Sequence, residues 1–485
     1  MILKSSSSTA RIFTRALLSS GATAQHFSAA PALRSKMAES NSTQANGASV
    51  TAYQPRYIDI GINLADPIFR GRYHGKSRHP DDLQGVIDRA KEVGCTKLLV
   101  TGSSFKSSRD ALKIASEFPN VVFTTAGIHP CSSSIFSPSH HKHHDESQSE
   151  DESADQHTPA CGPDPTKPIL DGEGVDHARS EVIISDLKDL ITTAPKNSLI
   201  AFGEFGLDYD RLHYCSKEVQ LHSFDAQLRL AASLSPQLPL FLHSRAAHGD
   251  FVRLLKYAFG PRLEKLQKGG VVHSFTGTIE EAKELMDLGL YIGINGCSFK
   301  TVENCEVVKQ IDLSKMMLET DGPWCEVRPT HEGWKYLVQF EEARRKEEEE
   351  KKRLEEEERQ KQEKIEAERK AQEELEKKAA ELELGGGVEG GKAGGEGEKK
   401  RQRQPKKPKQ RQQPQGKNQK KESEVPDRFK VVKKEKWEEG AMVKGRNEPC
   451  TIERIARIVA GIKGVGVEEV CEAAWENTAK VFGPF

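Results

Sequence analysis

Short apolar runs alternate with stretches of helical periodicity along most of this chain. The runs have the composition of buried strands, and the stretches between them repeat apolar residues at helical spacing, as Leu221, Phe224 and Leu228 do. Because strands that alternate with helices form parallel sheets with right-handed crossovers, the pattern predicts an α/β protein with one closed TIM (β/α)8 barrel. The predicted strands cover residues 57–63, 97–100, 121–128, 198–204, 240–243, 271–273, 290–295 and 317–321.

Helices are expected between these strands and after the last one. Pro80, followed by two acidic residues, suits the start of the first helix, because a proline at the first helical position sacrifices no hydrogen bond. The expected helices lie near residues 80–93, 109–118, 180–193, 216–231, 246–258, 279–288, 452–459 and 467–482. The last two follow a long interruption and should complete the outer ring of the barrel.

The alternation is interrupted twice by sequence of biased composition. Residues 131–178 are rich in Ser, His, Asp, Glu and Pro. The histidine run at 140–144 could bind a transition metal, but it has no fixed ligand spacing, which favours a solvated low-complexity insert. Residues 341–384 contain too few apolar residues for a coiled-coil seam and predict a single charged helix. The barrel is therefore assigned to residues 53–340 and 428–485.

The second insert, 341–427, continues into a glycine-rich linker at 385–397 and a basic segment at 399–421. The basic segment carries eleven Lys or Arg and no acidic residue. It could contact nucleic-acid phosphates or act as a nuclear import signal, and a solvated disordered tail is the plain alternative. The insert follows the last strand on the active-site side of the barrel, from where it could reach a substrate.

The first 38 residues are basic, rich in Ser and Ala, and contain no acidic residue before Glu39. This composition is typical of a mitochondrial transit peptide, so residues 1–52 are predicted to be a disordered tail and the protein to be mitochondrial. A plain disordered tail is the alternative. A start at Met37 would instead give a form in the cytoplasm or nucleus.

Composition narrows the class of protein further. Hydrophobic residues make up 36% and charged residues 30%, and removing the biased segments leaves roughly one barrel's length of sequence. The net charge is −1, but the positive and negative residues are concentrated in different segments, so the net value says little about binding partners. Nine cysteines without CxxC spacing argue against a zinc ribbon and a disulfide scaffold and suit a reducing compartment. No apolar run is long enough to span a membrane.

Four predicted strands end in residue types that bind metals, namely Glu204, His243, His273 and Asp321. In a parallel barrel these ends meet on one face, so the four predict a metal site there. A divalent ion held by carboxylates and imidazoles polarises a phosphoryl or carbonyl oxygen and lowers the pKa of a bound water. Asp321 is well placed to accept that water's proton, and Glu204 could bridge two ions. Any one of the four alone would more often be a buried, hydrogen-bonded polar group.

A second group of polar residues is expected to contact the substrate. Arg245 could bind two oxygens of a phosphate, and His129 could donate to a substrate phosphate. Asp208 could orient a ligand or contact the substrate from its loop, and Asn63 ends the first strand. Each of these four residues could equally stabilise a loop.

Several short motifs occur in one order across nearly all the globular sequence, and together they are specific although each is weak alone. They are Asp59-Ile60-Gly61-Ile62-Asn63-Leu64, Asp66-Pro67-Ile68-Phe69, Gly127-Ile128-His129-Pro130, Gly203-Glu204-Phe205-Gly206-Leu207-Asp208, Leu242-His243-Ser244-Arg245, His273-Ser274-Phe275-Thr276-Gly277, Glu319-Thr320-Asp321-Gly322-Pro323-Trp324 and Arg446-Asn447-Glu448-Pro449. In these motifs the chain resembles eukaryotic members of the TatD family of metal-dependent deoxyribonucleases.

The resemblance implies a barrel of the amidohydrolase type that hydrolyses DNA phosphodiesters. It implies Mg²⁺ as the cofactor, with one or two ions and Mn²⁺ as an alternative, and a 3′-to-5′ exonuclease acting on single-stranded ends. It carries metal binding onto Glu204, His243, His273 and Asp321, with Asp321 and Glu204 expected to act in catalysis. The protein is expected to bind DNA, to be a monomer and not to associate with membranes.

One position departs from many relatives of this family. They carry His-x-His after the first strand, where this chain has Gly61 and Asn63. The departure leaves open whether a second metal ion binds. Two alternatives to the nuclease remain: another metal-dependent ester or amide hydrolase on the same barrel, and an inactive relative that only binds nucleic acid.

Overall fold

The computed structural model describes residues 53–138, 168–172, 174–384 and 425–483. The N-terminal tail with its predicted transit peptide, the histidine run of the first insert, and the glycine-rich and basic segments of the second insert lie outside these ranges. Residues from Tyr53 onward belong to one unit of the chain.

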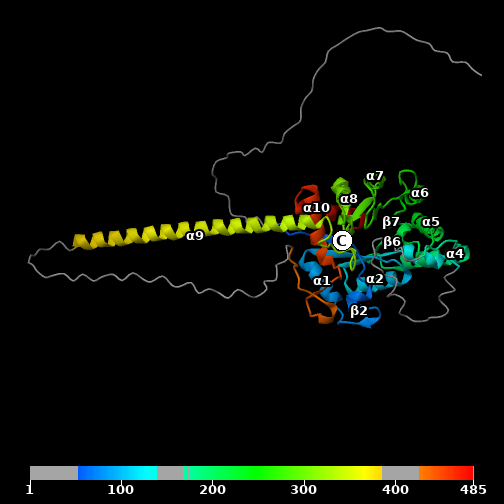
Figure 1. Ribbon diagram of the computed structural model, residues 1–485, viewed down its shortest axis with the longest axis horizontal. Coiled ribbons are helices and arrows are strands. Elements are labelled where there is room, and N and C mark those ends of the chain that lie inside the picture. The colour runs from blue at the N-terminus through cyan, green and yellow to red at the C-terminus, as the bar shows by residue number, and fades with distance from the viewer. Residues whose placement is uncertain (1–52, 139–167, 173, 385–424, 484–485) are drawn as a thin grey trace, which may run out of the picture. The chain divides into compact units, whose positions relative to one another are not determined.

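The eight predicted strands form one parallel sheet in which each strand pairs with the next along the chain (Figure 1). The last strand lies against the first, because the Asp321 N–H donates to the Gly61 carbonyl at 2.7 Å and the Asn63 N–H to the Gly322 carbonyl at 2.8 Å. This closure confirms the predicted TIM barrel. Its strands are β1 (Tyr57–Ile62), β4 (Cys95–Val100), β5 (Val122–Ala126), β6 (Leu199–Asp208), β7 (Leu240–Arg245), β8 (Gly270–Val272), β9 (Tyr291–Ile294) and β10 (Met316–Leu318).

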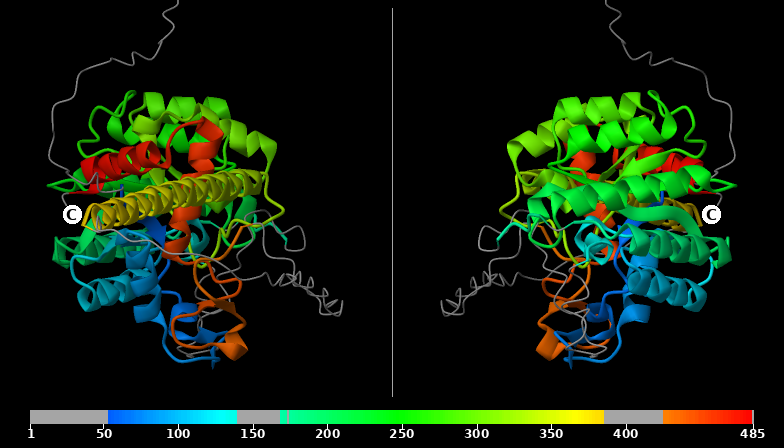
Figure 2. Two further views of the ribbon diagram at one scale, coloured as in Figure 1. Left: turned by 90° about the vertical axis from the view of Figure 1, so that its left-hand side faces the viewer. Right: turned by 90° about the vertical axis from the view of Figure 1, so that its right-hand side faces the viewer.

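Helices surround the sheet on its outside (Figure 2). They are α1 (Leu83–Glu92), α2 (Phe105–Glu117), α4 (His177–Thr193), α5 (Lys217–Ser233), α6 (His248–Phe259), α7 (Ile279–Asp287), α8 (Val302–Gln310), α10 (Ile452–Lys463) and α11 (Val467–Phe482). The sequence analysis missed α8, although Thr301 caps it by accepting the Asn304 N–H, as a helix start requires. The predicted outer helices after the second insert are α10 and α11.

Part of the first predicted insert belongs to the barrel. Residues Pro130–Phe136 form a 3-10 helix, η2, whose Phe136 side chain is fully buried and packs near His222 of α5. The assignment of residues 131–136 to a solvated insert was therefore wrong. Most of this stretch is polar, and Ile135 and Phe136 are the apolar residues in it that pack onto the barrel.

The interior of the barrel is filled by side chains that point inward from the strands. They are Ile58, Ile60, Leu99, Phe123, Ala201, Phe241, Val271, Tyr291 and Met317. Val481 and Phe482 at the end of α11 join this cluster, so the C-terminal helix helps to fill the barrel. A second, larger apolar layer lies between the strands and the helices, as expected for strands buried on both faces.

The long helix α9 (Trp334–Leu384) covers the region for which the sequence predicts a charged helix (Figure 1). Its first turns pack on the barrel, where Leu337 is buried, while from Glu342 to Ala380 only Glu356 is partly buried. Ion pairs one turn apart, such as Lys352–Glu348 and Lys370–Glu366, both at 2.8 Å, line the exposed part. Such pairs at helical spacing favour the helix, but only weakly, because solvent screens them. No helix of the described part of the chain could cross a membrane.

A buried network of ion pairs attaches the chain that returns after the second insert. Arg446 and Glu448 are at most 1% exposed and pair at 2.8 Å. Glu448 also binds Arg89 of α1 at 2.8 Å, and Asp82 accepts from Arg89 at 2.9 Å and from Arg446. Removing one partner of such a network leaves a buried charge uncompensated, which typically costs about 3–5 kcal/mol.

Asp59 is buried in β1 beside the seam where the barrel closes. Its Oδ1 accepts the Thr320 N–H at 2.9 Å and the Gly61 N–H at 3.2 Å, and its Oδ2 is hydrogen-bonded to the Thr320 hydroxyl. Burial raises the pKa of Asp59 to about 8, although the hydrogen bonds from Thr320 and Gly61 act in the opposite direction.

Asp59→Asn should therefore make stability less dependent on pH. A raised folded-state pKa gives stability that is present below the unfolded value of about 3.9 and is lost as pH rises through about 8. Asparagine keeps an acceptor at one position and a donor at the other, and it does not titrate. Urea unfolding between about pH 5 and pH 9 should show a smaller fall in unfolding free energy for the variant, since a pKa difference of one between the folded and unfolded states corresponds to about 1.4 kcal/mol. Parallel pH profiles for the two proteins would contradict this account of Asp59.

Candidate metal centre

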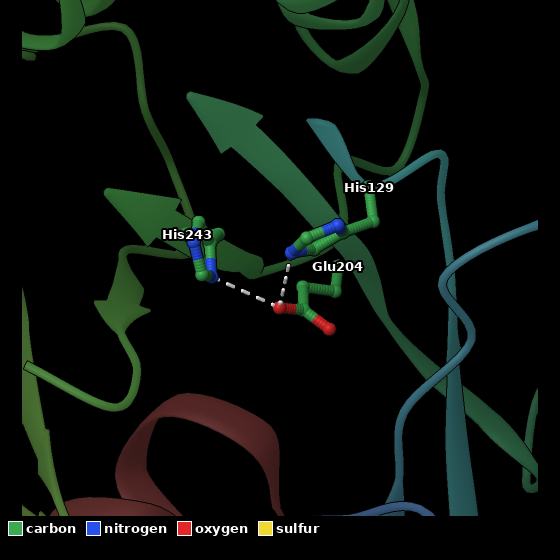
Figure 3. Close-up of side chains that lie close together, drawn as sticks. All are labelled: His129, Glu204 and His243. Carbon is green, nitrogen blue, oxygen red and sulfur yellow. Dashed lines mark hydrogen bonds and ion pairs between the residues drawn. The ribbon is translucent and has the colours of Figure 1, made fainter. Parts of the chain in front are cut away.

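Glu204 lies at the centre of a cluster of imidazoles on the catalytic face of the barrel. Its Oε1 is 2.7 Å from His273 Nε2, 3.1 Å from His243 Nδ1 and 3.3 Å from His129 Nε2. Figure 3 shows His129 and His243 converging on this oxygen. The four residues come from β6, β7 and the ends of β5 and β8, so the closure of the sheet brings them together.

The strand that carries Glu204 is longer than the sequence predicts. It runs to Asp208, so Glu204 lies within β6 and Asp208 ends it, rather than Glu204 ending the strand and Asp208 lying in a loop. The register against β7 shifts between Gly203 and Phe205. A bulge of this kind redirects side chains, and an apolar pattern along the sequence does not reveal it.

His243 is fixed between two carboxylates. Its Nδ1 faces Glu204 and its Nε2 lies 3.1 Å from Asp208 Oδ2, and Asp208 is fully buried. Burial would raise the pKa of Asp208, but the hydrogen bond with His243 and the charges of Arg211 and Arg245 lower it to about 2. Asp208 therefore stays ionised and can orient His243, as partners behind metal-binding histidines commonly do.

His273 is held from behind by a carboxylate that the sequence analysis did not single out. Its Nδ1 is 3.5 Å from Oε2 of Glu319, and its ring stacks on Phe241 with 4.7 Å between centroids. Glu319 is fully buried and accepts the Ser274 N–H. Its position in the sequence, directly after the apolar run of β10, could have indicated this role. A buried carboxylate costs free energy unless it has a partner.

Gly61 makes room for this carboxylate. Any side chain at position 61 would overlap Glu319 Oε2. The space beside Gly61 in β1 is thus taken by Glu319.

Asp321 follows β10 and is oriented by three neighbours. Its Oδ1 accepts from Asn63 Nδ2 at 3.0 Å, and its Oδ2 lies 3.4 Å from the Ser274 hydroxyl and 3.2 Å from the Cys325 sulfur. Burial raises the pKa of Asp321 to about 6, although the charge of His273 opposes the rise. Asn63 thus positions Asp321, and a direct contact of Asn63 with substrate stays a prediction.

The predicted substrate contacts His129 and Arg245 flank the cluster. His129 Nδ1 accepts the Cys131 N–H at 3.1 Å, and burial lowers the pKa of His129 to about 3. A neutral His129 therefore carries its proton on Nε2, the nitrogen that faces Glu204. Arg245 is 9% exposed and lies opposite Asp208 on the neighbouring strand. Binding of a phosphate by either residue stays a prediction.

The protonation pattern of the cluster fits a site for a cation. Burial would raise the pKa of Glu204, but the charge of His273 and the hydrogen bonds from His243 and His273 hold it well below its usual value. The carboxylates of Glu204 and Glu319 hold the pKa of His273 well above its usual range against the effect of burial. Ligand-type atoms of His129, Glu204 and His243 lie within 4.8 Å of one another, close enough to surround a divalent ion. Because Nδ1 of His129 accepts the Cys131 N–H, the other ring nitrogen of His129 is a donor at this site.

A closed parallel barrel with buried carboxylates and imidazoles at its strand ends defines a metal-dependent hydrolase of the amidohydrolase type. The sequence model of one such family, TatD related DNase, matches residues 58–379. The chain belongs to this family, as the motifs predicted.

Relatives and solved structures agree with this assignment. The chain is 35% identical over 425 residues to "Deoxyribonuclease Tat-D" of Schizosaccharomyces pombe, covering 87% of this chain and 94% of the relative. It is 33% identical to "3'-5' ssDNA/RNA exonuclease TatD" of Erwinia tasmaniensis over 55% of this chain and 80% of that protein. Its fold is similar to the crystal structure of an uncharacterized amidohydrolase from Saccharomyces cerevisiae, with a TM-score of 0.60, 28% identity, and coverage of 88% and 100%.

Glu319→Gln should weaken metal binding, because it removes the charged acceptor behind His273 Nδ1. Loss of such an outer partner typically lowers metal affinity by about 10- to 100-fold. Titration calorimetry with Mn²⁺ would measure the change, and circular dichroism would check the fold. Glu326→Gln, a matched change in the loop after Asp321, should bind Mn²⁺ like the unaltered protein. An affinity of Glu319→Gln within twofold of that control would show that Glu319 does not support the site.

Proposed function

We propose that this protein is a Mg²⁺-dependent deoxyribonuclease that removes nucleotides from single-stranded DNA ends in the 3′-to-5′ direction. The observation that carries the proposal is the buried Glu204 carboxylate, which faces three imidazoles on the catalytic face of the barrel. The names of two relatives support the substrate, since one is a deoxyribonuclease and the other a 3′-5′ exonuclease acting on single-stranded DNA or RNA.

The residues of the cluster divide the chemistry among them. Glu204, His243, His273 and Asp321 would hold the divalent ion, which supplies polarisation of the phosphoryl oxygen and a bound water of lowered pKa. Asp321, with a pKa of about 6, is ionised near neutral pH and can accept the proton of the attacking water. His129 presents its Nε2–H toward the same space and can donate to a phosphate oxygen. Asp208 keeps the ring of His243 oriented throughout.

A basic surface with aromatic side chains lies on the catalytic face and would bind the DNA strand. The connection from β1 to α1 contains the hairpin β2 (Arg72–Tyr73) and β3 (Lys76–Ser77), and such connections lie on this face. Lys434 Nζ is 4.8 Å from the centre of the Tyr73 ring, and Trp437 stacks on His79 at 5.4 Å. The same segments carry the exposed cations Arg72, Lys76, Arg78, Lys433, Lys436 and Lys444, together with the exposed acids Glu435, Glu438 and Glu439. Cations with stacking platforms suit single-stranded nucleic acid.

Two properties of the whole protein belong to this proposal. The basic, acid-free N-terminal sequence supports a mitochondrial enzyme, with Met37 as the start of a cytoplasmic or nuclear form. We also propose that it acts as a monomer, since one barrel supplies every side chain of the cluster.

Purified protein with Mg²⁺ should shorten 5′-labelled single-stranded DNA from its 3′ end, and EDTA should abolish the cleavage. Glu204→Gln should reduce the rate of cleavage by more than about 100-fold. Loss of a residue that only supports a metal ligand typically reduces activity by less than this, and Glu204 is proposed to bind the metal itself. The variant should still bind DNA in a filter assay. Undiminished cleavage by Glu204→Gln would refute the assignment of the site. DNA binding without cleavage under any divalent ion would identify an inactive relative.

Reversing charge on the basic surface should weaken DNA binding without touching the metal centre. The double variant Lys434→Glu, Lys436→Glu should bind single-stranded DNA more weakly and with a shallower dependence on salt. The slope of log affinity against log salt should fall by about 0.7 for each phosphate that the variant no longer neutralises. Fluorescence anisotropy at several salt concentrations measures both effects. Lys283→Glu on α7, an exposed change on the outer ring, is the control and should leave the slope unchanged. An equal weakening in both variants would place the DNA elsewhere.

A further inference from the structure

Two cysteine side chains meet beside the metal centre. The sulfur atoms of Cys297 and Cys325 lie 2.9 Å apart. Cys297 belongs to the 3-10 helix η4 (Gly296–Phe299), which follows β9, and Cys325 follows β10 by a few residues. Neither residue is used by the proposed hydrolysis.

The backbone holds the two thiols close together. Any side chain at position 296 would overlap the Cys325 carbonyl, so Gly296 allows the two segments to touch. Cys325 has a positive φ of 55°, a conformation that a residue with a side chain keeps only where its surroundings impose it. The Asn295 side chain accepts the Cys297 N–H at 2.9 Å and fixes the other segment. The sulfurs need to approach by only about 0.9 Å to reach a disulfide bond length.

Both segments also touch the carboxylate of Asp321. The Cys325 thiol donates to Asp321 Oδ2 at 3.2 Å. Asn295, which caps the helix of Cys297, donates to the Ser274 hydroxyl at 2.9 Å, and that hydroxyl donates to the same oxygen at 3.4 Å. A change at the thiol pair therefore removes the Cys325 thiol from Asp321 directly. It also shifts Asn295, which supports the Ser274 hydroxyl that donates to Asp321.

We propose that Cys297 and Cys325 form a redox-sensitive thiol pair, and that their disulfide weakens the metal centre by withdrawing Cys325 from Asp321. The oxidant that converts the two thiols to a disulfide is a peroxide. The partly exposed Cys325 sulfur attacks it, the O–O bond breaks, and a sulfenic acid and one water form. The buried Cys297 sulfur then attacks this sulfenic sulfur, the S–O bond breaks, and the disulfide and a second water form. The two thiols lose two electrons and the peroxide gains them; a dithiol reductant reverses the bridge.

The covalent part of this proposal does not depend on the proposed nuclease activity. Full-length protein is treated with hydrogen peroxide under native conditions, remaining thiols are alkylated, and peptides are mapped by mass spectrometry. We expect a peptide pair joined through Cys297 and Cys325 with the mass of two hydrogen atoms missing. Calorimetry should then show Mn²⁺ affinity lowered by at least about tenfold, as for loss of an outer partner, and dithiothreitol should restore it.

Two variants distinguish the effect of the Cys297–Cys325 disulfide from the effect of oxidation elsewhere in the protein. Cys297→Ser should bind Mn²⁺ normally before treatment, form no bridge, and gain oxygen on Cys325; with excess peroxide this oxidation reaches the sulfinic or sulfonic acid, which dithiothreitol does not reverse. Cys305→Ser, a change at another buried cysteine on α8, should bridge and recover like the unaltered protein. Complete alkylation of both cysteines after peroxide, a bridge to any other cysteine, or a bridge that leaves Mn²⁺ affinity unchanged would overturn the proposal.

Discussion

The catalytic face of this barrel is built around the free-energy cost of burying the Glu204 carboxylate. A buried carboxylate without compensation is unstable, and here Glu204 is compensated by three imidazoles. The Glu204 carboxylate and the His273 imidazole favour each other's charged form, which lowers the pKa of Glu204 and raises the pKa of His273. A divalent cation can take over the role of the proton on His273. Cation binding is thus favoured by the same electrostatics that hold the cluster together.

The parallel barrel is what makes this arrangement possible, because it brings distant strand ends to one face. The sequence analysis predicted the eight strands and their order, since buried parallel strands are continuous apolar runs. The same pattern pointed to Glu204, His243 and His273, because a ligand-type residue after such a run is conspicuous, but not to Glu319. These are the features that a local pattern encodes directly.

The features that were missed depend on contacts between distant segments. The position of Glu204 inside β6 results from a register shift against β7, and nothing in its own neighbourhood signals that shift. Glu319 acquires its role only because Gly61 leaves space for it across the barrel seam. The helix α8 has only 9 residues, too few for a clear helical repeat of apolar positions. Phe136 was assigned to an insert because polar neighbours surround it.

Gly61 and Asn63 of the first strand shape the metal centre through the carboxylates beside them. Asn63 orients Asp321, and Gly61 admits the Glu319 carboxylate behind His273. The cluster therefore has fewer imidazoles and more carboxylate character than a site with two further histidines. Imidazole ligands suit zinc and other transition metals, whereas oxygen ligands suit Mg²⁺ and Mn²⁺. The carboxylates of Glu204 and Asp321 are therefore the ligands that support the proposed Mg²⁺ in a cluster whose other side chains are imidazoles.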